Sequence, residues 1–304
     1  MENVLFVVNP AAASGRASRV WSSLRARLPC LRTANVVYCD GASIARQAII
    51  DALTPAIRRI VVLGGDGTLH TTLNVMLADA PDATRCLGLI PVGTGSDLAR
   101  GLGIETQPLR ALTQALEARA GHLDVLRLRC GAQSRYFINE TSIGMTAMVA
   151  ARVNALTHRN TGSFLVAALR ELIDYKPKWA RICLDGQLWR EGFFSMVVVA
   201  NSTHFGKGMC IAPGADATDG QADIVVVEAA SRAKLLAWLP AIYLGLHLNA
   251  PFVHYARAQS IDIDTGPDCL VFEGDGEVTL PAPGNVTVLH GALLFSGASD
   301  HAGT

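Results

Sequence analysis

The first part of the chain alternates short continuous apolar runs with stretches whose apolar residues recur at helical spacing. Continuous runs bounded by turn residues are typical of strands buried on both faces. The pattern predicts strands at residues 4–8, 35–38, 60–63 and 86–91, and helices at residues 17–28, 43–53 and 69–77. Such an alternation of strand and helix predicts a parallel sheet covered by helices on both faces.

The pattern changes near Asp124, where short apolar runs begin to alternate with turn residues, as in an antiparallel sheet or sandwich. The runs lie at residues 125–130, 136–139, 179–184, 193–200, 224–227, 260–264, 269–272 and 286–289, with helical patches at 161–174 and 232–246. The sequence thus predicts a doubly wound α/β domain over residues 1–125 and a β-rich sandwich domain over residues 126–304. Whether the last residues return to the first domain stays open.

Composition excludes several classes of protein. Apolar residues make up 50% of the 304 residues and charged residues 17%, so a substantial core is expected and disorder is not. The formal net charge is zero, which gives no support for bulk binding to nucleic acid. The seven cysteines form no C-x-x-C pair, as expected for reduced thiols in a cytoplasmic protein.

No segment has the pattern of a signal peptide or a membrane span. The apolar run at residues 4–8 stops at Asn9 and Pro10, and no run reaches the roughly 18 apolar residues of a spanning helix. We therefore expect a soluble or peripheral protein. One patch, residues 232–246, is rich in Leu, Trp and Tyr at helical spacing. Core packing is the first interpretation of this patch, and a lipid-facing surface is the alternative.

The most specific local signal is Gly64-Gly65-Asp66-Gly67-Thr68, which directly follows a predicted buried strand and opens a predicted helix. Glycines let the backbone turn sharply and approach a ligand closely. A strand, a glycine turn and a helix N-terminus together make an anion site. An acid repels bare phosphate, so Asp66 indicates a nucleotide with its Mg²⁺.

A second such loop, residues 91–100, follows the next predicted strand and contains Thr94, Gly95 and Asp97. Asp97 could simply cap the following helix and pair with Arg100. Because ligands gather at the carboxyl ends of parallel strands, we expect this loop, the 64–68 turn and Asn9 to converge. The chain has neither a P-loop motif nor the glycine fingerprint of dinucleotide-binding folds.

With these motifs, the chain resembles the diacylglycerol kinase catalytic family, which includes the sphingosine and ceramide kinases. The resemblance covers nearly the whole chain. It rests on the two glycine loops, on residues 139–145, on residues 200–213, on Asp219-Gly220 and on the segment 272–277 that contains Asp275-Gly276-Glu277. It implies a lipid kinase that uses ATP and Mg²⁺, with its active site in a cleft between the two domains.

The resemblance also implies roles for particular residues. The 64–68 turn would hold the ATP phosphates, with Asn9, Arg16, Thr94 and Gly95 in the same pocket, and Asp66 and Asp97 would organise Mg²⁺. Glu277 or Asp275 would be the catalytic base, and we favour Glu277, although an ordinary hairpin turn is the competing interpretation. Asp219, with the backbone carbonyls of Asp216 and Gln221, matches a structural Mg²⁺ loop of bacterial members, and an ordinary turn at Asp219-Gly220 is the competing interpretation.

Three departures from the family pattern concern the acceptor. Ser96 stands where the family usually has Asn, Arg16 where bacterial relatives often have Lys, and no lysine occurs near residues 161–164. The expected partner is a lipid such as diacylglycerol at a membrane surface, for example the inner face of the cell membrane. The alternatives are a kinase of a soluble alcohol or of NAD, and a non-catalytic nucleotide-binding regulator. A homodimer is left open.

Overall fold

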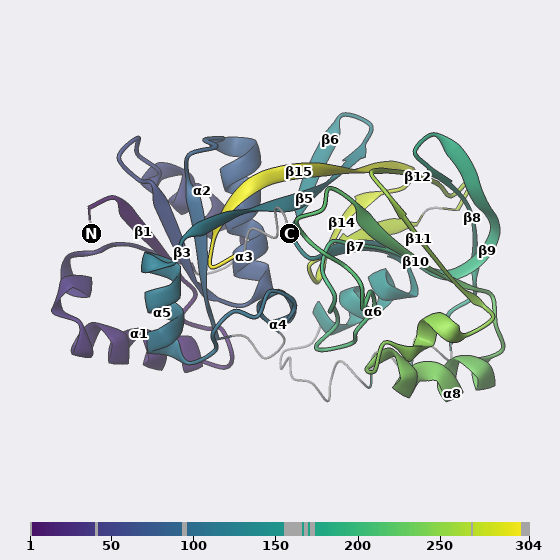
Figure 1. The fold of residues 1–304 in the computed structure, drawn as a ribbon, viewed down its shortest axis with the longest axis horizontal. Coiled ribbons are helices and arrows are strands. Elements are labelled where there is room, and N and C mark those ends of the chain that lie inside the picture. The colour runs from purple at the N-terminus through teal and green to yellow at the C-terminus, as the bar shows by residue number, and fades with distance from the viewer. Residues whose placement is uncertain are drawn as a thin grey trace. The chain divides into compact units, whose positions relative to one another are not determined.

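The structure, a computed structural model, describes residues 2–39, 42–92, 96–154, 166, 170, 174–268 and 270–298. It divides into two compact units (Figure 1). Unit 1 comprises Met1–Leu123 and Gly291–Thr304, and unit 2 comprises Asp124–His290. Strands β5 (Ala120–Cys130) and β15 (Gly284–Ser296) each contribute residues to both units.

Unit 1 is built on a parallel sheet in the order β15-β4-β3-β1-β2. Its strands are β1 (Val4–Val8), β2 (Asn35–Tyr38), β3 (Arg59–Gly64), β4 (Cys86–Pro91) and the end of β15. Strands β1, β3 and β4 are buried along almost their whole length, which is why their sequences are apolar without alternation.

Helices cover both faces of this sheet. Alternate residues of β1 and β3 pack with α1 (Arg16–Arg27) and α5 (Pro108–Glu117) in one apolar cluster that includes Phe6 and Trp21. The opposite face lies under α2 (Ala42–Ala52) and α3 (Asp66–Asn74). Short elements complete the unit: η1 (Pro29–Thr33), η2 (Val75–Asp79), a π-helical turn, and α4 (Asp97–Gly101).

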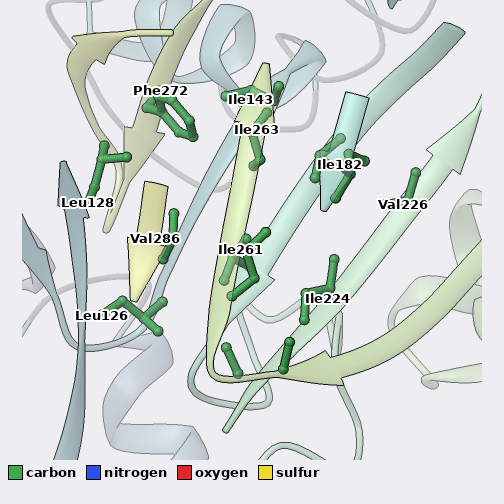
Figure 2. Packing of buried hydrophobic residues seen from close by; sticks show 14 of the residues in the cluster. Leu126, Leu128, Ile143, Ile182, Ile224, Val226, Ile261, Ile263, Phe272 and Val286 are labelled. Carbon is green, nitrogen blue, oxygen red and sulfur yellow. The ribbon is translucent and has the colours of Figure 1, made fainter. Parts of the chain in front are cut away.

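Unit 2 is a sandwich of mostly antiparallel strands. They are the end of β5, β6 (Gln133–Phe137), β7 (Glu140–Gly144), β8 (Lys178–Leu184), β9 (Gln187–Ala200), β10 (Ala222–Glu228), β11 (Val253–Ala258), β12 (Ser260–Asp264), β13 (Val271–Gly274), β14 (Glu277–Pro281) and the start of β15. Side chains from these strands meet in one core, among them Leu128, Ile182, Ile261 and Phe272 (Figure 2).

Strands β9 and β10 carry apolar residues on both faces. Val197, Val199 and Ile224 point into the sandwich core. Val198 and Val225 point the other way, into a second cluster that is covered by α8 (Arg232–Ile242) and η3 (Leu246–Asn249). Helix α6 (Met145–Asn154) follows β7. None of the helices in the described residues combines the length and apolarity that a membrane crossing requires.

The predicted fold class, an α/β unit and a β-rich unit, is confirmed. The helix predicted at 232–246 ends earlier, at Ile242, because Gly245 adopts a left-handed conformation before η3. Strand β7 is missing from the prediction because Glu140, Thr141 and Ser142 are polar, yet all three are buried. Most of the helix predicted at 161–174 lies outside the described residues.

Candidate active site

Three loops of unit 1 start at the same edge of its parallel sheet. Strands β1, β3 and β4 are neighbours, and their last residues are in register: Val8 pairs with Leu63, and Gly64 pairs with Pro91. The loop after each strand leads to a helix, α1, α3 and α4 respectively. The topology therefore places Asn9, the 64–68 turn and the start of α4 at one edge, as the sequence predicts.

A hydrogen bond joins the first two loops. The Asn9 Nδ2 donates to Thr68 Oγ1 at 3.1 Å, and Asn9 Oδ1 accepts from the Ala11 N–H at 3.1 Å. Gly64 makes this contact sterically feasible, because a Cβ there would lie 2.8 Å from Thr68 Oγ1 and 2.9 Å from Thr68 Cβ. Gly64 and Gly65 do not adopt positive φ. Close approach, and not a left-handed turn, therefore explains the glycine at position 64.

The helix after this turn begins at once. Helix α3 starts at Asp66, with the Thr68 and Leu69 N–H groups both donating to the Gly65 carbonyl at 3.1 Å. The N-terminus of α3, the end of a helix that favours an anion, therefore lies directly after β3. Asp66 and Gly67 are half-buried at this edge.

The third loop leads into α4 through Ser96, which has φ 46° and ψ 47° in the left-handed region. Asp97 is buried, and its Oδ1 accepts from Arg100 at 3.2 Å. Asn tolerates left-handed backbone better than Ser does, which gives a physical reason for the family's usual Asn at position 96. The predicted site residues Thr94 and Gly95 lie outside the described residues.

The first loop is conformationally unusual. Ala13, Ser14 and Gly15 all have positive φ, at 51°, 55° and 83°. Residues other than glycine rarely adopt this region, and such outliers cluster at ligand sites. Arg16 follows as the first residue of α1, and its side chain is exposed. The predicted phosphate cation thus stands at the start of the helix that follows the Asn9 loop.

In unit 2, Asp275 and Gly276 form the two-residue turn between β13 and β14. Their φ values are 51° and 84°, and Gly274 pairs with Glu277 across the hairpin. Asp-Gly is the sequence that such turns favour. Residues outside this hairpin hold the turn in place, because the Asp275 carboxylate accepts from the backbone N–H groups of Ile138, Asn139 and Glu140 at 3.3, 3.1 and 3.3 Å.

Glu277, the first residue of β14, differs from Asp275. It is half-buried, and within the described part of the chain no group donates a hydrogen bond to its carboxylate. The carboxylate oxygens of Asp275 accept the hydrogen bonds that hold the turn, whereas the carboxylate of Glu277 accepts none from a described residue. The geometry therefore separates two acids that the sequence could not tell apart.

A buried carboxyl pair, unforeseen from the sequence, lies beneath this turn. Ser142 Oγ donates to Glu273 Oε1 at 2.5 Å, and Glu140 and Glu273 are both buried close to each other. Burial raises the pKa of Glu273 to about 7, and burial together with the Glu273 charge raises the pKa of Glu140 well above its ordinary value.

The predicted Mg²⁺ loop is held by a buried acid. Fully buried Asp124 accepts from the Gly220 N–H at 2.7 Å and bonds His290 Nδ1 at 2.8 Å. Asp219 forms an ion pair with Arg257, and Gln221 donates its N–H to Asp219 Oδ1 at 3.0 Å.

Asp216 and a neighbouring acid complete the oxygen-rich surroundings of this loop. The Asp216 side chain turns back on Thr218, accepting from its hydroxyl at 2.6 Å. Burial raises the pKa of Asp223, and its buried Oδ2 accepts no hydrogen bond from a described residue. The donor set therefore fits Mg²⁺, although Arg257 already neutralises Asp219.

Among the described residues, no group of three or more His, Cys, Asp or Glu side chains is arranged to hold a metal ion. The loop at 216–221 differs from such a group because two of its three predicted ligands are backbone carbonyls. Asn9, Arg16, the 64–68 turn and Asp97 thus belong to unit 1, whereas Asp275, Glu277 and the 216–221 loop belong to unit 2.

The chain matches two family models along most of its length. Residues 3–128 match the diacylglycerol kinase catalytic domain, and residues 139–296 match the YegS C-terminal NAD kinase beta sandwich-like domain. The fold and these matches define a kinase, a phosphotransferase that acts on an alcohol acceptor. The chain belongs to the diacylglycerol kinase catalytic-domain family of lipid kinases, which confirms the resemblance seen in its motifs.

Relatives of known name agree with this assignment. A diacylglycerol kinase of Mycobacterium tuberculosis (strain CDC 1551 / Oshkosh) is 29% identical over 296 residues, covering 95% of this chain and 93% of the relative. A diacylglycerol kinase of Staphylococcus saprophyticus is 29% identical over 252 residues, or 79% of each chain. The crystal structure of a diacylglycerol kinase from Bacillus anthracis shares the fold, with a TM-score of 0.71 at 21% identity over 97% of this chain and 96% of that one.

Proposed function

We propose that this lipid kinase transfers the γ-phosphoryl group of ATP to the hydroxyl of diacylglycerol or a closely related lipid alcohol. One structural observation supports the proposal most strongly: the bond between Asn9 and Thr68 and the start of α3 lie at one edge of the unit 1 sheet. Backbone N–H groups at a helix start are suited to phosphate. The acceptor is inferred from relatives that are named diacylglycerol kinase.

The proposal assigns nucleotide binding to unit 1. The 64–68 turn would hold the phosphates, with Asn9, Arg16, Thr94 and Gly95 around them. Mg²⁺, organised by Asp66 and Asp97, would neutralise charge on the phosphates when bound. The half-buried position of Asp66 and the burial of Asp97 support this role, because a carboxylate shielded from water interacts more strongly with a cation.

Proton acceptance is assigned to Glu277. Its carboxylate would take the proton of the lipid hydroxyl as that oxygen attacks the γ-phosphorus, and the bond from the γ-phosphorus to the bridging oxygen would break to release ADP. Asp275 would be a positioning residue, because three backbone N–H groups hold its carboxylate. The buried pair of Glu140 and Glu273 would support the same turn.

The 216–221 loop is proposed to bind a structural Mg²⁺ through the Asp219 carboxylate and the carbonyls of Asp216 and Gln221. Its all-oxygen donor set supports the assignment. Arg257 competes for the Asp219 carboxylate, so we expect the affinity to be modest.

An acceptor screen tests the proposed reaction. ATP labelled in the γ-phosphate is supplied with diacylglycerol, sphingosine, glycerol or NAD, and the labelled product is identified. We expect label to appear in the phosphorylated lipid and ATP turnover to depend on the lipid. Label in NAD or glycerol without label in lipid, or turnover that ignores the acceptor, would refute the proposal.

A further inference from the structure

Helix α8 and the residues after it present an apolar surface away from the core of unit 2. We define the outer face of α8 as Leu236 on the helix together with Tyr243, Leu244 and Leu246, which follow it; all four are exposed. These are four of the eleven large exposed hydrophobic residues in the described part of the chain, within one stretch of eleven positions. Exposed apolar residues are normally scattered, so such a concentration indicates a binding surface.

This exposure does not come from a detached helix. The opposite face of α8 packs on the second apolar cluster of unit 2 through Leu235, Trp238, Leu239 and Ile242. The Trp238 ring meets the Phe252 ring edge-on, with 6.3 Å between the ring centroids, and the Cys210 N–H donates to the Ile242 carbonyl at 3.0 Å. Figure 1 shows α8 outside strands β10 and β11. The helix is therefore anchored on one side, and on its other side it exposes Leu236.

The segment of the chain that carries this surface contains bases but no acids. Residues 229–261 contain no Asp or Glu, although the whole chain has equal numbers of acids and bases. Arg232 and Lys234, both exposed, begin α8. The acids that bound the stretch are paired, Glu228 with His254 at 2.7 Å and Asp262 with Asn285 at 2.8 Å, and Arg257 within the stretch pairs with Asp219. Arg232 and Lys234 have no acid next to them in the sequence.

We propose that the outer face of α8 docks on the surface of a lipid bilayer that contains anionic lipids. Apolar residues beside cations match the acyl boundary and the headgroups of such a bilayer. A second copy of the chain fits less well, because a two-fold interface here would bring Arg232 and Lys234 near their own copies. This inference rests on the proposed function in one respect: a lipid substrate gives the protein a reason to bind a bilayer.

Hydrogen bonds within unit 2 connect the elements that carry the outer face of α8 to the turn at Asp275 and Gly276. His247 Nε2 hydrogen-bonds to the Ile211 carbonyl at 2.9 Å, which ties η3 to the loop after β9. Asn139 Nδ2 donates to His204, in the same loop, at 2.8 Å, and the Asn139 N–H holds Asp275. The loop that supports α8 therefore also supports the residue beside Asp275.

Vesicle binding by the full chain tests this inference without requiring catalysis. The probes are vesicles of phosphatidylcholine, with and without phosphatidylglycerol, and binding is measured by co-sedimentation. The variants are Leu244→Asp, the double change Arg232→Glu with Lys234→Glu, and the control Leu188→Asp. Leu188 is a matched control because it is 61% exposed, against 73% for Leu244, and lies on β9.

We expect wild type to bind the anionic vesicles, Leu244→Asp and the double variant to lose about tenfold in binding, and Leu188→Asp to match wild type. Turnover on a short-chain diacylglycerol dispersed as monomers should stay unchanged in Leu244→Asp. Equal losses in Leu188→Asp and Leu244→Asp would overturn the proposal. The proposal would also be overturned if Leu244→Asp dissociated a dimer of the chain but bound vesicles like wild type. A chain that binds vesicles but phosphorylates no lipid would refute the proposed function alone.

Discussion

Each unit holds one half of the candidate site residues, and the two halves are built in different ways. In unit 1, three loops share one edge because their strands are parallel neighbours, and one side-chain bond, from Asn9 to Thr68, links the first two loops. In unit 2, the 275–277 turn depends on buried polar groups far away in sequence, with Asp275 bonded to residues 138–140. Topology alone places the first half, whereas the second requires buried hydrogen bonds. The predictions that follow probe this difference.

The largest expected effect comes from Gly64→Ala in unit 1. The new Cβ would meet Thr68 at 2.8 Å and displace the hydroxyl that accepts from Asn9. Overpacking and a lost hydrogen bond together cost about 2–4 kcal/mol. We expect ATP affinity, measured by calorimetry, to fall about a hundredfold.

Gly214→Ala is the matched control for this change, because a Cβ there meets only Tyr255 Oη, at 4.0 Å, and φ is not positive. The control should bind ATP like wild type. Equal ATP affinity in Gly64→Ala and wild type would show that close packing at this turn does not shape the nucleotide site.

In unit 2, Glu273→Gln should change how stability depends on pH. The folded pKa of Glu273 is about 7, above its ordinary value of 4.5, so the folded state binds more protons between these values. Stability therefore falls as pH rises through this window and levels off above it. Because Gln does not titrate, the free energy of unfolding should fall by about 1–3 kcal/mol more in wild type than in Glu273→Gln between about pH 4.5 and 8.

Urea unfolding at several pH values measures this difference. Glu191→Gln serves as the control, since Glu191 is exposed and pairs with Arg181 at the surface. The control should follow the wild-type pH dependence. Parallel curves for Glu273→Gln and wild type would mean that the buried pair carries no proton in the folded state.

A smaller effect is expected for Arg257→Ala at the 216–221 loop. Removing the guanidinium frees the Asp219 carboxylate, so Mg²⁺ should bind about 3–10-fold more tightly, which is a gain of about 1 kcal/mol in binding free energy. The rise of the unfolding midpoint with Mg²⁺ concentration measures this affinity. An Arg181→Ala control should leave it unchanged. If Mg²⁺ shifts the midpoint of neither wild type nor Arg257→Ala, the loop is not a metal site.

The smallest effect concerns Ser96→Asn, which places a residue that tolerates left-handed backbone at φ 46°. We expect stability to rise by about 0.3–0.8 kcal/mol in denaturant unfolding. The control is Ser18→Asn in the exposed face of α1, where Asn has no such advantage. A gain at position 18 that equals the gain at position 96 would refute this explanation of the family's Asn.

The sequence predicts unit 1 more completely than unit 2, and the reason is physical. Continuous apolar strands followed by glycine turns leave a strong local signal, so the edge that carries Asn9 and the 64–68 turn could be inferred. The first residues of strand β7 are polar and buried, and its contacts with Glu273 and Asp275 join positions more than 130 residues apart. No local pattern reports such a contact. The distinct surroundings of Asp275 and Glu277 therefore emerged only from the structure.

The central claim is that Glu277 accepts the proton while Asp275 holds the turn. The most direct test compares lipid phosphorylation at saturating ATP in wild type, Glu277→Gln and the control Glu191→Gln, with ATP affinity and unfolding measured in parallel. We predict that Glu277→Gln lowers turnover about a hundredfold to ten-thousandfold while ATP affinity and stability stay at wild-type values. Near wild-type turnover in Glu277→Gln would contradict the account.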